Sequence, residues 1–144
     1  MKDPYNLQRF IDAQNPVIED VCSELRAGQK VGHWMWFIFP QMKGLGHSYL
    51  ANQYAISSKA EALAYISHPV LGTRLKECTE LVCLEHGCSI KDIFGYPDFA
   101  KFRSSMTLFS MVTSDNQVYL NALAKYFQGQ PDPLTVKIIE KAKN

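Results

Sequence analysis

Apolar side chains recur every three to four residues over most of the chain, which is the spacing of amphipathic helices. The clearest case is Val17, Ile18, Val21, Cys22 and Leu25, which follow an i, i+1, i+4, i+5, i+8 pattern. Positions with that spacing lie on one face of a helix and can face a common core. We therefore expect a helix in this part of the chain.

Residues that favour the starts and ends of helices divide the rest of the chain into further helices. Proline fits the first turn, Ser, Asp or Asn fits the position before it, and glycine fits the position just past the end. The predicted starts are Asp3-Pro4, Asn15-Pro16, Ser58, His68-Pro69, Ser89, Pro97 or Asp98, Ser114 or Asp115, and Asp132-Pro133, and the predicted ends include Gly28, Gly87 and Gly129. Glu61 has the capping-box spacing from Ser58. The chain is predicted to be mainly α and to form a single multi-helix domain over residues 1–144.

The stretch "GHWMWFIFPQMKGLGHS", residues 32–48, fits two conformations. Its aromatic and β-branched residues favour an extended segment around 33–39, and Pro40 biases Phe39 away from the helical region. A lone strand, however, finds no partner elsewhere in the sequence. We therefore favour a buried, partly helical segment followed by a glycine-rich turn at residues 43–46, with a small sheet as the alternative.

Composition and charge exclude several classes of function. Hydrophobic residues make up 47% of the chain and charged residues 20%, which is ordinary for a soluble domain. A net charge of +1 without a basic run argues against nucleic-acid binding. The N-terminus lacks the apolar core of a signal peptide, and the longest apolar run, Trp34 to Phe39, is far shorter than the roughly 20 residues that span a bilayer. We expect a soluble cytoplasmic protein without nucleic-acid or membrane partners, and leave homo-oligomerisation open.

The four cysteines do not have the spacing of a metal site. Cys22 lies far from the others, and Cys78, Cys83 and Cys88 follow one another at five-residue steps. On a helix such steps are about 140° apart, so neighbouring cysteines of this set cannot share a face. We therefore predict free thiols that act as small buried side chains, with no metal and no cofactor.

The aromatic stretch is the first candidate binding site. Tryptophan faces with a few polar groups beside them are typical of small-molecule pockets, and glycines let backbone N–H groups approach a ligand closely. The ligand-binding residues predicted here are His33, Trp34, Trp36, Gln41, Gly44, Gly46 and Ser48. The "GLG" spacing does not match a dinucleotide fingerprint. The alternative is a plain turn whose aromatic side chains fill the core.

The second candidate site is "FAKFRSSMTLF", residues 99–109. If this segment is helical, Lys101, Ser104 and Ser105 lie within one turn of one another. A lysine beside hydroxyl groups can bind an anion, or act as an amine nucleophile when its pKa is lowered. We assign a catalytic role to Lys101 and ligand contacts to the two serines. The alternative is that the hydroxyls bond back to helix carbonyls and Lys101 is a surface charge.

Three further polar residues are expected to have structural roles. His68 precedes a proline and is expected to cap or pack at a helix junction. Asp98 and Asp132 each adjoin a proline at a predicted helix start, so we expect both to act as caps.

The chain resembles a known family over nearly its whole length. The segments that carry the resemblance are "RFIDAQNPVIEDVCSELRAGQKVGHWMWFIFPQMKGLGHS", "YAISSKAEALAYISHPVLGTRL", "IFGYPDFAKFRSSMTLF" and "YFQGQPDPLT". They resemble the domain-of-unknown-function 1810 family, a group of small bacterial cytoplasmic proteins that is sometimes labelled calpastatin. The apolar-rich, capped sequence is unlike the disordered polar inhibitor that this label denotes. The family implies no particular activity.

A more distant resemblance points to the NADAR (YbiA-like) group, whose members cleave N-glycosidic bonds in ADP-ribose-type or riboflavin-pathway compounds. The shared features are "EALAYISHPVLG" and the later pair Lys101-Phe102. The resemblance implies that the chain binds a small nucleotide or ribosyl compound, as an N-glycosidase-like hydrolase. The competing hypothesis is a non-catalytic protein-interaction module in which the aromatic stretch is core or interface.

Overall fold

The computed structural model describes residues 2–85 and 87–142, and in that part of the chain it contains ten helices and no strand. The helices are α1 (Gln8–Gln14), α2 (Ile18–Ala27), α3 (Met35–Ile38), α4 (Tyr49–Gln53), α5 (Lys59–Ser67), α6 (Leu71–Leu84), α7 (Ile90–Phe94), α8 (Asp98–Val112), α9 (Gln117–Phe127) and α10 (Pro133–Ala142). The prediction of a mainly α fold is confirmed. None of the described helices is long and apolar enough to cross a membrane.

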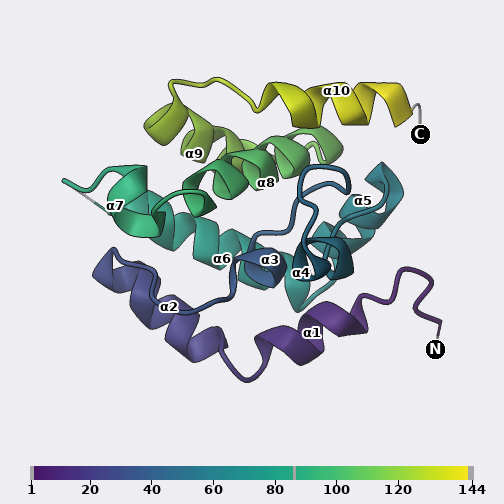
Figure 1. Cartoon of the computed structure of the whole chain (residues 1–144), viewed down its shortest axis with the longest axis horizontal. Coiled ribbons are helices and arrows are strands. Elements are labelled where there is room, and N and C mark those ends of the chain that lie inside the picture. The colour runs from purple at the N-terminus through teal and green to yellow at the C-terminus, as the bar shows by residue number, and fades with distance from the viewer. Residues whose placement is uncertain (1, 86, 143–144) are drawn as a thin grey trace.

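Helix α8 is the central element and packs against α5, α7, α9 and α10. Helix α6 packs against α5 and α9 and, on another side, against α2. Figure 1 shows the result as a stack, with α10 at one edge, α8 and α9 below it, then α6, and α1 and α2 at the opposite edge. The aromatic stretch and α4 therefore lie on a scaffold of longer helices.

Aromatic rings fill the centre of the core. The Phe102 ring of α8 lies edge-on to Phe39, with ring centroids 5.0 Å apart, and is also 5.0 Å from Phe94. Trp34 contacts Phe39 and Phe94 at 6.3 and 6.4 Å. Edge-to-face pairs at these separations are favourable beyond the apolar area they bury. The first half of the aromatic stretch is thus built into the core.

Several of the predicted caps are present, whereas the C-cap positions of α6 and α9 are Glu85 and Gln128 rather than Gly87 and Gly129. The Ser89 side chain and the Asp92 side chain form a reciprocal capping box at the start of α7. Asp132 accepts a hydrogen bond from the Thr135 N–H at 3.0 Å, which caps α10. Gly28 ends α2 in the left-handed conformation, with φ of 75°. These short signals were readable because each acts within one turn of chain.

Three predicted helix starts are displaced. Asp3 does not open a helix at Pro4, and its carboxylate instead accepts from the N–H groups of Leu7 and Gln8, where α1 begins. The N-cap position of α9 is occupied by Asn116 rather than by Ser114 or Asp115. The start predicted at Asn15-Pro16 is also displaced, since the N-cap position of α2 is Val17. Helix α8 begins where the sequence predicts, with Pro97 at the N-cap position, and only the capping role predicted for Asp98 is wrong.

The Glu61 carboxylate has a different partner from the one that the sequence predicts. Ser58 caps α5 by accepting from the Glu61 N–H at 3.0 Å, as expected. The Glu61 side chain, however, does not return to Ser58. It accepts from the N–H and hydroxyl of Ser57 at 3.0 and 2.7 Å and pairs with the Arg9 guanidinium at 2.9 Å. The capping-box prediction for Glu61 is wrong, because the Glu61 carboxylate pairs with the Arg9 guanidinium of α1 instead of accepting from the Ser58 N–H.

The aromatic stretch contains one helical turn rather than a strand. Residues Met35–Ile38 form α3, and Phe39 follows with a non-helical backbone before Pro40. The alternative of a small sheet is reduced to one isolated parallel bridge between Met42 and Ile56 in the described chain. The partly helical prediction for residues 33–39 is confirmed.

The corner between α5 and α6 has no room for a side chain at Gly72. A Cβ atom at this position would lie 2.0 Å from the carbonyl oxygen of Ile66. The His68 ring closes the same corner, because its Nδ1 accepts from the N–H groups of Val70 and Leu71 at 3.1 and 3.3 Å. The predicted capping role of His68 is confirmed.

Candidate functional site

Trp34 is buried in the core and is not available to contact a ligand. It is 2% exposed, and its indole N–H donates to the Glu24 carboxylate of α2 at 2.9 Å. The same carboxylate oxygen accepts from the backbone N–H groups of Val31 and Gly32 at 2.7 and 2.9 Å. Glu24 therefore fixes the segment that leads into α3, and the next tryptophan, Trp36, is the one left partly exposed.

The Glu24 contact with Trp34 predicts a pH dependence of stability. Partial burial raises the pKa of Glu24, but the hydrogen bonds from Gly32, Val31 and Trp34 outweigh it, so the pKa lies below its ordinary value. Because the folded-state pKa is the lower one, the carboxylate contributes stability above the unfolded-state pKa, and this contribution is lost as the pH falls through the folded-state value.

We therefore expect Glu24→Gln to lower the free energy of unfolding by about 1 kcal/mol at neutral pH. The difference from the wild type should shrink as the pH falls below the ordinary carboxyl value of 4.5. Urea denaturation at a series of pH values measures it. A difference that stays the same at every pH would contradict this account.

Asp98 lies between two lysines, one of which stands beside Trp36. Asp98 accepts from Lys30 at 2.8 Å and lies 3.6 Å from the Lys101 ammonium. The Lys101 ammonium is also 4.9 Å from the centre of a Trp36 ring, within the range of cation–π attraction. Of the two lysines, Lys101 is the one that lines the depression described below, and its ammonium is the charge there that can meet a negatively charged ligand.

A small depression lies where α3, the segment after it, α4 and α8 meet. Its volume is about 10 Å³, enough for one water molecule. It is lined by Met35, Trp36, Phe39, Gln41, Ala51, Tyr54 and Lys101. Trp36 and Gln41 of the aromatic stretch are thus brought together with Lys101 of α8, a predicted site residue from a distant part of the sequence. We call this place the Trp36–Lys101 depression.

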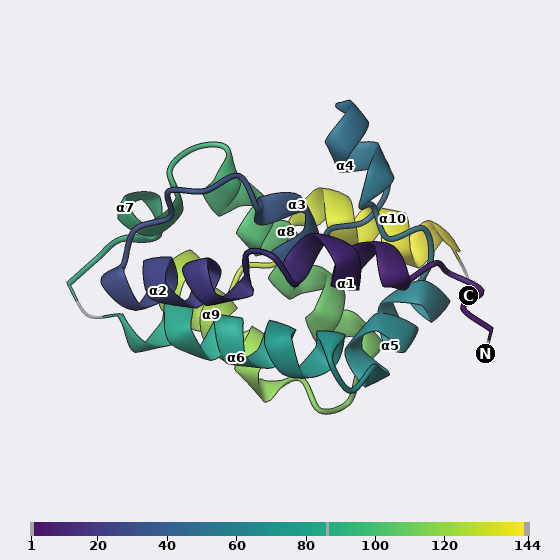
Figure 2. The same ribbon diagram turned by 90° about the horizontal axis from the view of Figure 1, so that it is seen from below.

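One wall of the depression belongs to a loop that is closed at its base. Residues 42–56 leave and rejoin the core at the Met42–Ile56 bridge, where the Lys43 N–H donates to Ile56 and the Ile56 N–H donates to Gln41, both at 2.9 Å. Figure 2 shows α4, which this loop carries, projecting away from the other helices. Compact loops with pinned ends often carry function, because they can move as a unit.

Three predicted ligand residues shape this 42–56 loop instead of lining the depression. A Cβ atom at Gly46 would lie 2.7 Å from the Cβ of Ala51, so the loop can close on itself only with glycine there. Gly44 has φ of +103°, in the region that favours glycine. The Ser48 hydroxyl accepts from the Ala51 N–H at 3.1 Å and caps α4.

The other predicted residues lie outside the depression. His33 is exposed on the surface. The Ser104 hydroxyl bonds back to the Ala100 carbonyl at 3.1 Å, as in the alternative that the sequence left open. Ser105 is fully buried one turn after Lys101 on the same face of α8, and its hydroxyl has no hydrogen-bond partner among the described residues. A buried hydroxyl of this kind is uncommon in proteins.

Sequence reasoning missed Lys30, Asp98 and Tyr54 as site residues. The three-residue spacing between Asp98 and Lys101 was a signal that their side chains are neighbours on a helix. Nothing local in the sequence pointed to Lys30 or Tyr54, because the folding of the chain brings both to the site from other segments.

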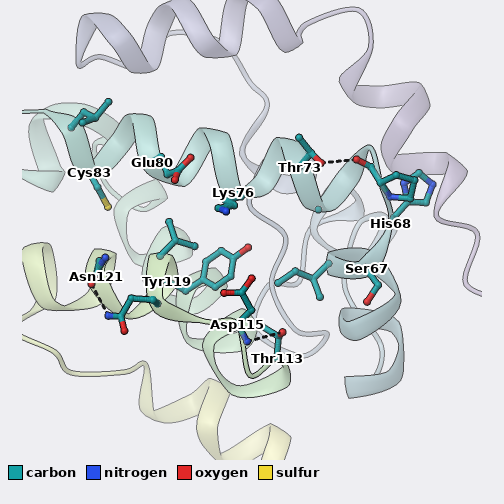
Figure 3. Close-up of a pocket in the computed structure, with 16 residues that line it drawn as sticks. Ser67, His68, Thr73, Lys76, Glu80, Cys83, Thr113, Asp115, Tyr119 and Asn121 are labelled. Atoms are coloured by element: carbon teal, nitrogen blue, oxygen red, sulfur yellow. Dashed lines mark hydrogen bonds between the residues drawn. The ribbon is translucent and has the colours of Figure 1, made fainter.

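A larger cavity lies on a different side of the molecule. It has a volume of about 860 Å³ and runs between one face of α6 and the beginning of α9, with the α5–α6 corner at one end. Figure 3 shows Glu80 and Lys76 on α6 facing Tyr119 and Asp115 across it. We call it the α6–α9 groove. Local sequence patterns did not indicate this groove, because its two sides lie about 40 residues apart along the chain.

The cysteines remain free thiols. Cys78 is buried, Cys22, Cys83 and Cys88 are partly buried, and none is in a disulfide. Burial raises the pKa of the Cys78 thiol to about 12 and also raises that of Cys83. Among the described residues no cluster of three His, Cys, Asp or Glu side chains has the arrangement of a metal site.

Comparison with known proteins defines the class of this chain. It belongs to the family described as "Protein of unknown function (DUF1810)", whose model matches residues 4–139. The resemblance seen in the sequence is therefore confirmed for that family.

One solved structure is very similar over the whole fold. It is the crystal structure of the conserved hypothetical protein Rv1873 from Mycobacterium tuberculosis, which shares 54% sequence identity with this chain. The two superpose with a TM-score of 0.95, over 96% of this chain and 99% of that one. No curated protein matches the chain.

Proposed function

We propose that this cytoplasmic protein binds a small nucleotide or ribosyl compound at the Trp36–Lys101 depression. One observation carries the proposal: the two candidate segments meet at one place, where Trp36 and Gln41 of the aromatic stretch line the depression with Lys101 of α8, whose ammonium lies 4.9 Å from a Trp36 ring centre. An aromatic face beside a positive charge suits a ligand that combines a flat ring with a phosphate.

Each of the three side chains has a distinct task in this proposal. Trp36 stacks on the ring, and the Gln41 amide supplies a donor and an acceptor to its polar edge. Lys101 contacts the phosphate, and Lys30 adds to the positive charge across Asp98, at 2.8 Å from that carboxylate. The geometry of the lysines supports an anion here rather than a cation.

The depression must open to admit such a ligand, since about 10 Å³ holds only a water molecule. The 42–56 loop is the element that can move, because Ala51 and Tyr54 form one wall and the loop is joined to the core at the Met42–Ile56 bridge. We propose that α4 swings outward and closes over the bound ligand, which would exclude water from it.

Within this proposal, the reaction class is N-glycosidic hydrolysis, as the NADAR resemblance implies. Water adds to the ribosyl carbon while the bond to the base breaks, and the base leaves with a proton. Positive charge builds up on the ribosyl group during this step. In this step Lys101, which lines the depression, holds the anionic part of the substrate. If Lys101→Ala turned over an identified substrate at the wild-type rate, the catalytic role of Lys101 would be wrong.

A thermal-shift screen with nucleotides, ADP-ribose and sugar phosphates tests the binding proposal. A ligand that binds only the folded state raises the melting temperature at saturation. We expect at least one ribosyl compound to do so, and Trp36→Leu and Lys101→Met to reduce its affinity by about tenfold each, the equivalent of one charge-assisted contact.

The matched control is Lys137→Met, which removes an exposed lysine of α10 and should leave the shift unchanged. A flat response of the wild-type protein across the set would contradict ribosyl binding. If Lys137→Met reduced the affinity as much as Lys101→Met does, the ligand would be responding only to the net charge of the protein.

A second candidate function is a protein-interaction module. It is favoured by Tyr49 on α4 and Tyr96 before α8, whose side chains are each 79% exposed. Exposed tyrosines are enriched at protein interfaces. If this function holds, Tyr49→Ser together with Tyr96→Ser will abolish a measured complex and leave any ligand-induced thermal shift intact.

A further inference from the structure

The two helices beside the α6–α9 groove are joined by hydrogen bonds at their C-terminal ends. The Tyr126 hydroxyl donates to the Val82 carbonyl at 2.5 Å, and the Lys125 ammonium donates to the Glu85 carbonyl at 2.6 Å. These bonds fix α9 against α6 at their C-terminal ends, while the α5–α6 corner fixes the other end of α6. The volume of about 860 Å³ lies within the roughly 300–1,000 Å³ typical of small-molecule sites.

Tyr119 places an unpartnered polar group in this groove. The residue is 2% exposed, lines the groove, and its hydroxyl makes no hydrogen bond to any described residue. Its ring lies between the two helices in Figure 3, with the hydroxyl directed toward α6. Burial, with the negative charges of Asp115 and Glu80, raises the pKa of Tyr119 to about 12, so the hydroxyl is neutral at ordinary pH. The ring is buried while the hydroxyl reaches the open space of the groove, where a ligand can contact it.

Two carboxylates stand beside that hydroxyl without partners of their own. Glu80 comes from α6, and Asp115 comes from the connection between α8 and α9. Neither carboxylate makes an ion pair or accepts a hydrogen bond within the described part of the chain. Lys76 is the single lysine or arginine among the described lining residues, so the groove carries an excess of negative charge.

We propose that the α6–α9 groove is a second ligand site and that it takes a small organic cation bearing a protonated amine. An ammonium has three donors and no acceptor, and Glu80, Asp115 and Tyr119 offer three acceptor groups, two carboxylates and a hydroxyl. Ile66 and Val118 line the same groove and contact the hydrocarbon part of such a ligand. The site is separate from the depression proposed above, whose positive charge suits anions, and it stands whether or not that proposal holds.

Titration with putrescine, followed by amide NMR, tests this site. We expect saturable shifts in α6 and in residues 113–121, and a much weaker response to the neutral diol analogue of putrescine. The double variant Glu80→Gln/Asp115→Asn should weaken binding by about tenfold or more, since it removes two ion pairs. Lys76→Gln should strengthen binding, because it removes the repelling charge.

The matched control is Asp20→Asn/Glu140→Gln, which removes two exposed carboxylates from α2 and α10 and should leave the affinity unchanged. The proposal is overturned if putrescine does not bind, if the diol binds equally well, or if the Glu80/Asp115 variant binds like the wild type. A single-lysine peptide that binds as tightly as putrescine would also overturn it, because the occupant would then be a basic protein segment.

Discussion

Replacing Gly72 with alanine is expected to lower the free energy of unfolding by about 3 kcal/mol. The added Cβ atom would lie 2.0 Å from the Ile66 carbonyl oxygen, and a backbone atom cannot move aside as a flexible side chain can. Helix propensity acts in the opposite direction, because alanine is favoured over glycine inside a helix by about 1 kcal/mol. The steric overlap is the larger effect, so the variant should be less stable.

Chemical denaturation of Gly72→Ala and of a second glycine variant checks this expectation. Gly129→Ala is the matched control, since a Cβ atom there meets nothing within 4 Å and the substitution strains only a backbone with φ of +75°. Its cost should be about 1 kcal/mol. A Gly72→Ala protein as stable as the wild type would show that α5 and α6 do not approach as closely as described.

Arg9→Met is expected to destabilise the protein by about 3 kcal/mol, because it leaves the Glu61 carboxylate buried without its cation. Glu61 is 2% exposed, and the Arg9 guanidinium is 2.9 Å from it. The same guanidinium donates to the carbonyl oxygens of Gln53 and Ala55 at 2.8 and 2.9 Å. The substitution therefore also releases the end of the 42–56 loop, and amide hydrogen exchange in that loop should become faster.

A double-mutant cycle separates the lost ion pair from lost packing. Arg9→Met/Glu61→Gln should recover part of the stability, because a neutral amide is less costly to bury without a cation than a carboxylate. Arg26→Met, an exposed arginine of α2, should change the stability by only a few tenths of a kcal/mol. A double variant no more stable than Arg9→Met would mean that the Arg9–Glu61 charge pair contributes little.

These two positions support different candidate sites. Gly72 sets the corner at one end of the α6–α9 groove, where Ile66 and His68 are lining residues. Arg9 holds the base of the loop whose Ala51 and Tyr54 line the Trp36–Lys101 depression. Each site therefore depends on a contact that holds one of its walls in place.

The candidate site was only partly predictable from the sequence. The aromatic stretch pointed to both tryptophans, but the structure leaves only Trp36 partly exposed, since Glu24 and the ring of Phe39 enclose Trp34. Lys101 was singled out by its helix, yet Lys30, which pairs with the same Asp98 carboxylate, came from a segment with no comparable signal. A sequence shows which side chains carry suitable chemistry, and burial decides which of them can reach a ligand.

The sequence by itself determined the mainly helical fold, the ends marked by Gly28 and Ser89, and the family. Those features depend on interactions within a few residues, or on motifs that stand together in the chain. Only the tertiary structure decided that Glu61 pairs with Arg9, that Asp98 lies between two lysines, and that a groove separates α6 from α9. These are contacts between distant segments, and local propensity cannot specify them because they arise when helices pack.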